Sequence, residues 1–157
     1  LNVAGIASMN LLATTPDETI SNIVNTNLIG TIFCTKEIIP AFASSKNGRI
    51  INFSSLAVKI GIQGESVYVA SKAGVEGFTR SIARELAPFN VTVNCISPGP
   101  IKTNLTSKVP TSYIDKVIDQ QIINKQCNKE DILNCVKIIL NPKADKITGE
   151  NFTIGGF

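Results

Sequence analysis

The stretch RIINFSS, residues 49–55, is a short apolar run that lies between an Asn-Gly turn at 47–48 and a pair of serines. An apolar run of this length between turn residues predicts a buried strand, here over Arg49–Phe53. A second such run, VTVNCI at Val91–Ile96, is rich in β-branched residues and stops at SPGP, residues 97–100. We therefore expect two buried strands, Arg49–Phe53 and Val91–Ile96.

The segment between these strands has the strongest helical pattern in the chain. Val75, Phe78, Ile82 and Leu86 recur at spacings of three, four and four residues, which places them on one face of a helix. The pattern predicts a helix over Ser66–Leu86. A helix that connects two buried strands is typical of a parallel sheet.

The N-terminal part of the chain predicts a strand end and then a long helix. Leu1–Ala4 has the pattern of a strand end that runs into a turn at Gly5. The sequence TPDE at 15–18 indicates a helix start, with Thr15 as the N-cap, proline at the first helical position and glutamate three residues after the cap. We expect this helix to run from Pro16 to about Ser44, and Pro40 is a candidate kink.

The C-terminal third predicts two more helices and a last strand. The expected elements are helices over Thr111 to about Asn124 and Asn128–Leu140, the second capped by Asn128, and a strand over Asn151–Ile154. This order of elements predicts an α/β fold with a doubly wound, mostly parallel sheet covered on both faces. In such sheets, ligands bind beyond the carboxyl ends of the strands.

Composition indicates a single domain over residues 1–157. The chain is 43% hydrophobic, which suffices for a sizeable core and argues against disorder. Lys and Arg number 15 and Asp and Glu number 12, a net charge of +3 that is too small to indicate nucleic acid as a partner. No uncharged apolar run reaches the roughly 18 residues of a membrane span, so we expect no membrane partner.

Histidine is absent from the sequence. Its absence excludes Ser-His-Asp and Cys-His catalysis and histidine-containing metal sites within these residues, so proton transfer would use Tyr, Lys, Asp, Glu or Cys. The cysteines at 34, 95, 127 and 135 form no C-x-x-C pair, and we predict no metal site. Cys34 and Cys95 lie in apolar runs, where we expect buried side chains. The cysteine pattern indicates a reducing cytoplasm.

Tyr68 and Lys72 are four residues apart on the predicted helix and therefore share a face. An ammonium beside a phenol stabilises the phenolate, so we expect the pKa of Tyr68 to fall and Tyr68 to act as a general acid or base. A surface pair without function is the alternative, because Tyr and Lys often fall at this spacing by chance. Ser55 favours a functional role for the pair, because it ends a strand 13 residues before Tyr68 and would lie at the same edge of the sheet.

Two residues of this candidate site have an alternative role. Ser54-Ser55 could serve as a helix cap or turn. Asn27 lies inside the first predicted helix, where asparagine is unfavourable. A kink with a freed carbonyl would explain it, and an exposed, tolerated asparagine is the alternative.

A series of motifs, in order and at family spacing, resembles the C-terminal two thirds of the classical short-chain dehydrogenases/reductases. Among these, the 3-oxoacyl-acyl-carrier-protein reductases are the most similar branch. The resemblance implies a Rossmann-like fold and covers essentially all 157 residues. The matching stretches are NVAG (2–5), NTNL (25–28), INFSS (51–55), YVASK (68–72), VTVN (91–94), SPGPI (97–101) and ITGE (147–150).

The resemblance implies hydride transfer between NAD or NADP and a small-molecule carbonyl or alcohol, including reduction of a 3-oxoacyl thioester. It assigns catalysis to four residues: Tyr68 is the acid/base, Lys72 lowers the tyrosine pKa and holds the nicotinamide ribose, Ser55 orients the substrate oxygen, and Asn27 kinks its helix and holds a relay water. It also implies that Asn2, Ile101 and Thr103 contact the cofactor, together with Tyr68 and Lys72.

Two departures from the family pattern weaken the case for acyl carrier protein as a partner. Pro100 stands where carrier-protein reductases often have Phe, and Phe89 where they often have a basic residue that touches the carrier protein. Acyl carrier protein therefore stays a candidate partner with weakened support. The resemblance also implies a homodimer or homotetramer.

The family's Gly-rich turn, which binds the cofactor pyrophosphate at a helix N-terminus, has no counterpart in these residues. The choice between NAD and NADP is therefore not encoded here. We expect the chain to be the catalytic and C-terminal portion of a longer oxidoreductase, weak or inactive by itself. The alternative is a truncated, non-catalytic homologue that acts only through oligomerisation.

Overall fold

A computed structural model of the chain describes residues 1–103, 105–107 and 109–157. Its sheet has the order β1-β2-β3 and is parallel throughout, which confirms the expected α/β architecture. Gly48 pairs with Val91 at the start of the β1–β2 ladder. The strands are β1 (Gly48–Phe53), β2 (Val91–Ser97) and β3 (Asn151–Thr153). All seven residues of β2 are buried, as expected for a strand between two neighbours.

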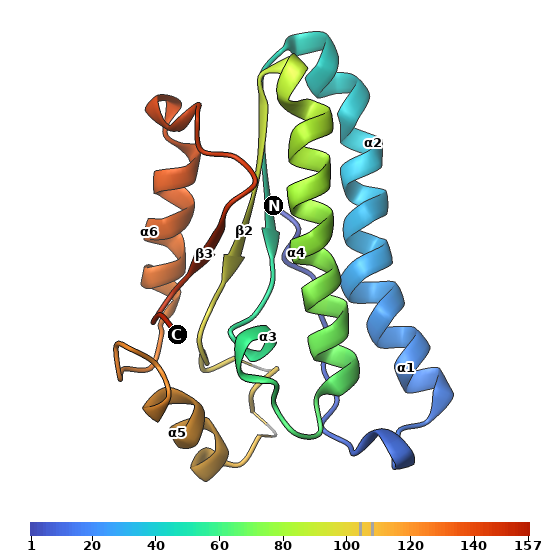
Figure 1. Cartoon of the computed structure of the whole chain (residues 1–157), viewed down its shortest axis with the longest axis vertical. Helices are drawn as coiled ribbons and strands as arrows, with labels where there is room; N and C mark the ends of the chain where they lie inside the picture. The colour runs from blue at the N-terminus through green and yellow to red at the C-terminus, as the bar shows by residue number, and fades with distance from the viewer. Residues whose placement is uncertain (104, 108) are drawn as a thin grey trace.

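Helices cover both faces of this sheet (Figure 1). The long helix α4 (Ser66–Leu86) packs on one face, with α1 (Asp17–Val24) and α2 (Gly30–Ser45) beside it. Helix α6 (Lys129–Leu140) lies on the other face. None of the helices in the described ranges is long and apolar enough to cross a membrane.

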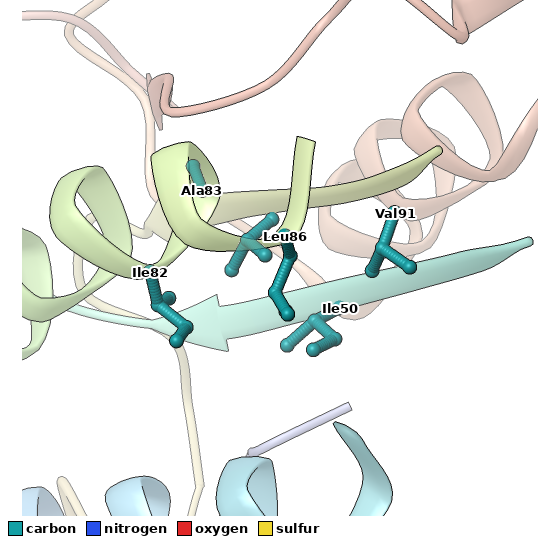
Figure 2. Close-up of a cluster of buried hydrophobic side chains, with 6 residues drawn as sticks. Ile50, Ile82, Ala83, Leu86 and Val91 are labelled. Atoms are coloured by element: carbon teal, nitrogen blue, oxygen red, sulfur yellow. The ribbon is translucent and has the colours of Figure 1, made fainter. Parts of the chain in front are cut away.

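Strand alternation divides the core into two clusters. Neighbouring residues of a strand point to opposite faces, so Ile50 packs against α4 whereas Ile51 packs on the side of α6. Figure 2 shows the α4 side, where Ile82 and Leu86 meet Ile50 and Val91. These contacts hold α4 against the first halves of β1 and β2.

The N-terminal helix starts and bends differently from the prediction. A π-helical turn at Asn25–Ile29 joins α1 to α2, so one helical path covers the predicted span. Thr15 is not its N-cap: the hydroxyl of Thr15 donates to the carbonyl of Leu11 at 3.0 Å. Pro16 has an extended backbone and is itself the cap residue. Its carbonyl accepts the first helical hydrogen bond, from the amide of Ile20.

The C-terminal elements follow the prediction with one shortened helix. Helix α5 (Thr111–Asp119) ends before Asn124, because the chain turns back and the amide of Ile123 donates to the carbonyl of Gly155. Asn128 caps α6 as expected, in a reciprocal capping box with Asp131. Four short elements of the described residues were not predicted: helix α3 (Ala57–Ile60) and the 3-10 turns Leu12–Thr14, Ala87–Phe89 and Pro142–Ala144.

Two smaller expectations meet different outcomes. Of the predicted strand end at Leu1–Ala4, the structure shows a single parallel bridge between Asn2 and Asn52. Cys95 is buried as expected, but Cys34 is exposed. The prediction for Cys34 was wrong because Thr31 and Thr35 form the buried face of α2.

Candidate active site

A cavity of about 710 Å³ lies where β1 and β2 end. This position, beyond the carboxyl ends of parallel strands, is where α/β sheets bind ligands. The N-terminal half of α4 forms one wall of the cavity, and α5 forms another. The predicted site residues that line it are Ser55, Tyr68, Lys72, Ile101 and Thr103.

Ser55, Tyr68 and Lys72 come together on the α4 wall. Tyr68 and Lys72 are 8% and 4% exposed, and the Lys72 ammonium lies 5.9 Å from the centre of the Tyr68 ring. The ammonium donates a hydrogen bond of 2.8 Å to the carbonyl of Phe53. The hydroxyl oxygen of Ser55 accepts from the amide of Ala57 at 3.2 Å, and Ser55 lies close enough to Tyr68 to lower its pKa. A proton donor, a second hydroxyl and a cation thus share one wall.

Burial is the largest influence on the pKa values of Tyr68 and Lys72. Burial raises the pKa of Tyr68 above its ordinary value, while the nearby Ser55 side chain lowers that pKa and the charge of Glu65 raises it further. Burial likewise lowers the pKa of Lys72. The predicted fall of the Tyr68 pKa was therefore wrong for this structure, because the cost of burying a phenolate exceeds the opposing influences.

Asn27 lies in the π-turn and is completely buried, which excludes the exposed alternative. Its side-chain oxygen accepts from the amide of Ile6 at 2.8 Å, and its nitrogen donates to the carbonyl of Ile6 at 2.9 Å and to Ser71 at 3.0 Å. Ser71 in turn donates to the carbonyl of Tyr68. Asn27 thus ties the N-terminal segment to α4 without lining the cavity itself.

The three expected cofactor contacts outside α4 separate into two groups. Ile101 and Thr103 line the cavity. Asn2 does not line the cavity. Its side-chain nitrogen donates instead to the side chains of Asn52 at 2.8 Å and Thr35 at 3.1 Å. The structure therefore uses the Asn2 side chain to join β1 to α2.

Two glutamates complete the surroundings, and sequence reasoning missed both. Glu65 lines the cavity three residues before Tyr68. Glu76 accepts a hydrogen bond of 2.7 Å from the hydroxyl of Ser54. The available signal was spacing: Glu65 and Tyr68, and Lys72 and Glu76, are three and four residues apart, and the helical spacing puts each pair on one side of α4. Among the described residues, no group of three or more His, Cys, Asp or Glu side chains could hold a metal ion.

Comparison with known proteins identifies the family. Residues 1–156 match the family model described as enoyl-(acyl carrier protein) reductase. The chain belongs to the short-chain dehydrogenase/reductase family. Within this family it is similar to the 3-oxoacyl-[acyl-carrier-protein] reductase FabG of Staphylococcus epidermidis, with 34% identity over 99% of the chain and 64% of that relative. FabG of Vibrio cholerae is 35% identical over the same shares.

Solved structures of the short-chain dehydrogenase/reductase family give the same result. A 4-hydroxyisoleucine dehydrogenase complexed with NADH superposes with a TM-score of 0.90 at 30% identity, over 99% of this chain and 65% of that one. A complex of the same dehydrogenase with NADH and succinate gives 0.88. The chain therefore spans less than two thirds of the length of these relatives.

Proposed function

We propose that this member of the family is an NAD(P)(H)-dependent oxidoreductase that interconverts a carbonyl and an alcohol. The observation that supports it most is the meeting of Ser55, Tyr68 and Lys72 on one wall of the cavity. In this proposal Ser55 orients the substrate oxygen and Tyr68 donates the proton to it during reduction. The charge of Lys72 favours the phenolate that Tyr68 leaves behind.

The cavity residues fit the nicotinamide end of such a cofactor. Lys72 uses one of its three donors on Phe53 and keeps two for ribose hydroxyls. Gly5 leaves open the space beside the ammonium, since a Cβ there would lie 3.4 Å from it. Ile101 and Thr103 are the further candidate contacts. When bound, NAD(P)H supplies the hydride, and the protein supplies position and a proton.

The proposed substrate and partners are supported by the relatives and by exposed apolar side chains. Because the FabG relatives are 3-oxoacyl-[acyl-carrier-protein] reductases, we include 3-oxoacyl thioesters among the proposed substrates and acyl carrier protein among the proposed partners. Phe33 and Ile38, both on α2, are 61% and 39% exposed. These exposed apolar side chains support the proposed homodimer or homotetramer.

The test is a Tyr68→Phe substitution, with Tyr113→Phe as the matched control. Tyr113 also lines the cavity, but its hydroxyl donates to the backbone carbonyl of Gln63. In a chain completed with the cofactor-binding part, with 3-oxoacyl thioesters as substrates and NADH or NADPH oxidation as the readout, Tyr68→Phe should lower the rate by more than tenfold, about 1.4 kcal/mol. Cofactor affinity should persist, and Tyr113→Phe should retain most activity. A Tyr68→Phe variant with more than about a tenth of the activity would show that the acid/base assignment is wrong.

A further inference from the structure

Glu65 presents a carboxylate to the cavity beside the proposed acid. It immediately precedes α4 and lines the cavity three residues before Tyr68. Its charge raises the pKa of both Tyr68 and Tyr113. A molecule whose carbonyl oxygen reaches Tyr68 therefore also lies near Glu65.

No structural role accounts for this carboxylate. Although Glu65 occupies the N-cap position of α4, its side chain makes no capping hydrogen bond. Only its backbone is used: the amide donates to the carbonyl of Ile62, and the carbonyl accepts from the amide of Val69. Within residues 1–103, 105–107 and 109–157, its carboxylate has neither a hydrogen bond nor an ion pair. The group is therefore free to interact with a bound molecule.

The surroundings strengthen the influence of this charge. Apolar side chains of Ile62, Val109 and Ile114 line the same cavity. Burial raises the pKa of Glu65, which indicates reduced solvation, and charges interact more strongly where water is scarce. Among the described lining residues, the one other full charge is that of Lys72, whose ammonium is bonded to the carbonyl of Phe53.

We propose that Glu65 selects substrates by charge: it admits carbonyl compounds that are neutral or cationic beyond the reacting carbon and disfavours those with a carboxylate or phosphate there. This inference rests on the proposed function and narrows its substrate class. A neutral 3-oxoacyl chain meets the requirement, as does a carbonyl compound with an ammonium group. Two like charges in a poorly solvated cavity repel, and this repulsion is the source of the discrimination.

Three ketones of similar length test this charge selection: 4-oxopentanoate, 4-oxopentanamide and (4-oxopentyl)trimethylammonium. Their binding is measured by ligand-observed NMR and their reduction by NAD(P)H oxidation, with the wild-type protein and with Glu65→Gln and Glu65→Lys. The matched control is Glu85→Gln, since Glu85 is an exposed residue of the same helix. The wild-type protein should bind the anion at least tenfold more weakly than the amide.

Glu65→Gln should bring the affinity for the anion to within about threefold of that for the amide and weaken binding of the cation about tenfold. Glu65→Lys should invert the order of anion and cation, and Glu85→Gln should change neither. Unchanged affinity ratios in both Glu65 variants would overturn the charge selection even if the amide is reduced. Altered ratios without reduction of any ketone would support the charge selection and count against carbonyl reduction.

Discussion

Ser54 donates a hydrogen bond of 2.7 Å to the carboxylate of Glu76 and so fastens α4 to the end of β1. Ser97, the last residue of β2, donates to the same oxygen at 3.4 Å. Glu76 lies one helical turn after Lys72, and Ser54 directly precedes Ser55. The contact therefore fixes the helix that holds Tyr68 and Lys72 relative to the strand end that holds Ser55, which makes Glu76 a positioning residue.

We predict that Glu76→Ala lowers the free energy of unfolding by about 1–3 kcal/mol, because the buried Ser54 hydroxyl loses its carboxylate acceptor and keeps only the longer contact, 3.3 Å, to the carbonyl of Lys72. Urea denaturation followed by circular dichroism measures the change. Glu85→Ala removes an exposed glutamate from the same helix and should cost less than about 0.5 kcal/mol. Equal losses for the two variants would mean that the hydrogen bond to Ser54 contributes nothing.

Lys72→Met should move the alkaline limit of carbonyl reduction to higher pH. Tyr68 can donate a proton only below its pKa, and that pKa is already raised by burial. The Lys72 ammonium, 5.9 Å from the Tyr68 ring, favours the phenolate, so its removal raises the pKa further. The pH–rate profile of reduction measures the shift.

Lys59→Met is the control for the Lys72 experiment, because Lys59 is an exposed cation on α3. Its pH–rate profile should match that of the wild type. Cofactor affinity should fall in Lys72→Met alone, since this variant loses the proposed ribose donor. A profile that stays in place in Lys72→Met would show that Lys72 does not tune Tyr68.

Local sequence signals predicted the elements whose causes are local. The bounds of α4 are those predicted from its apolar periodicity, and Asn128 caps α6 as its sequence indicated. The end of α5 depends on a contact between Ile123 and Gly155. A partner so distant in the sequence leaves no local pattern.

The site shows the same division between local and long-range causes. Spacing brought Tyr68 and Lys72 to one face of a helix, and the strand end placed Ser55 beside them. The sequence could not show that burial raises the pKa of Tyr68, because burial is produced by the whole fold. The sequence also could not show that the side chain of Asn2 hydrogen-bonds to Asn52 and Thr35, because these two residues lie far from Asn2 and from each other in the sequence.

Asn27→Ala should lower the free energy of unfolding by about 2–4 kcal/mol. The substitution removes three hydrogen bonds, two with the backbone of Ile6 and one with Ser71, and each contributes about 0.5–1.5 kcal/mol. Asn22→Ala, at an exposed position of α1, is the matched control and should stay within about 0.5 kcal/mol of the wild type. Chemical denaturation measures the free energy of unfolding of the two variants. A small change in Asn27→Ala would mean that water replaces the hydrogen bonds of the Asn27 side chain.

Cys95→Ala should make the protein less sensitive to alkaline pH. Burial is the main reason that the pKa of the Cys95 thiol rises from 9.0 to about 12. Between these values the unfolded chain loses a proton that the folded chain keeps, so the free energy of unfolding falls as pH rises, by up to about 1.4 kcal/mol per pH unit. From about pH 7.5 to about pH 10.5, the wild type should lose about 2 kcal/mol more than Cys95→Ala. Urea denaturation at both pH values measures this difference. The constant cost of the smaller side chain cancels, because it is the same at both pH values.

Cys34→Ala is the control, because Cys34 is an exposed cysteine. This variant should lose as much free energy of unfolding as the wild type between the two pH values. The same loss in Cys95→Ala would show that the buried thiol does not cause the fall in stability at alkaline pH.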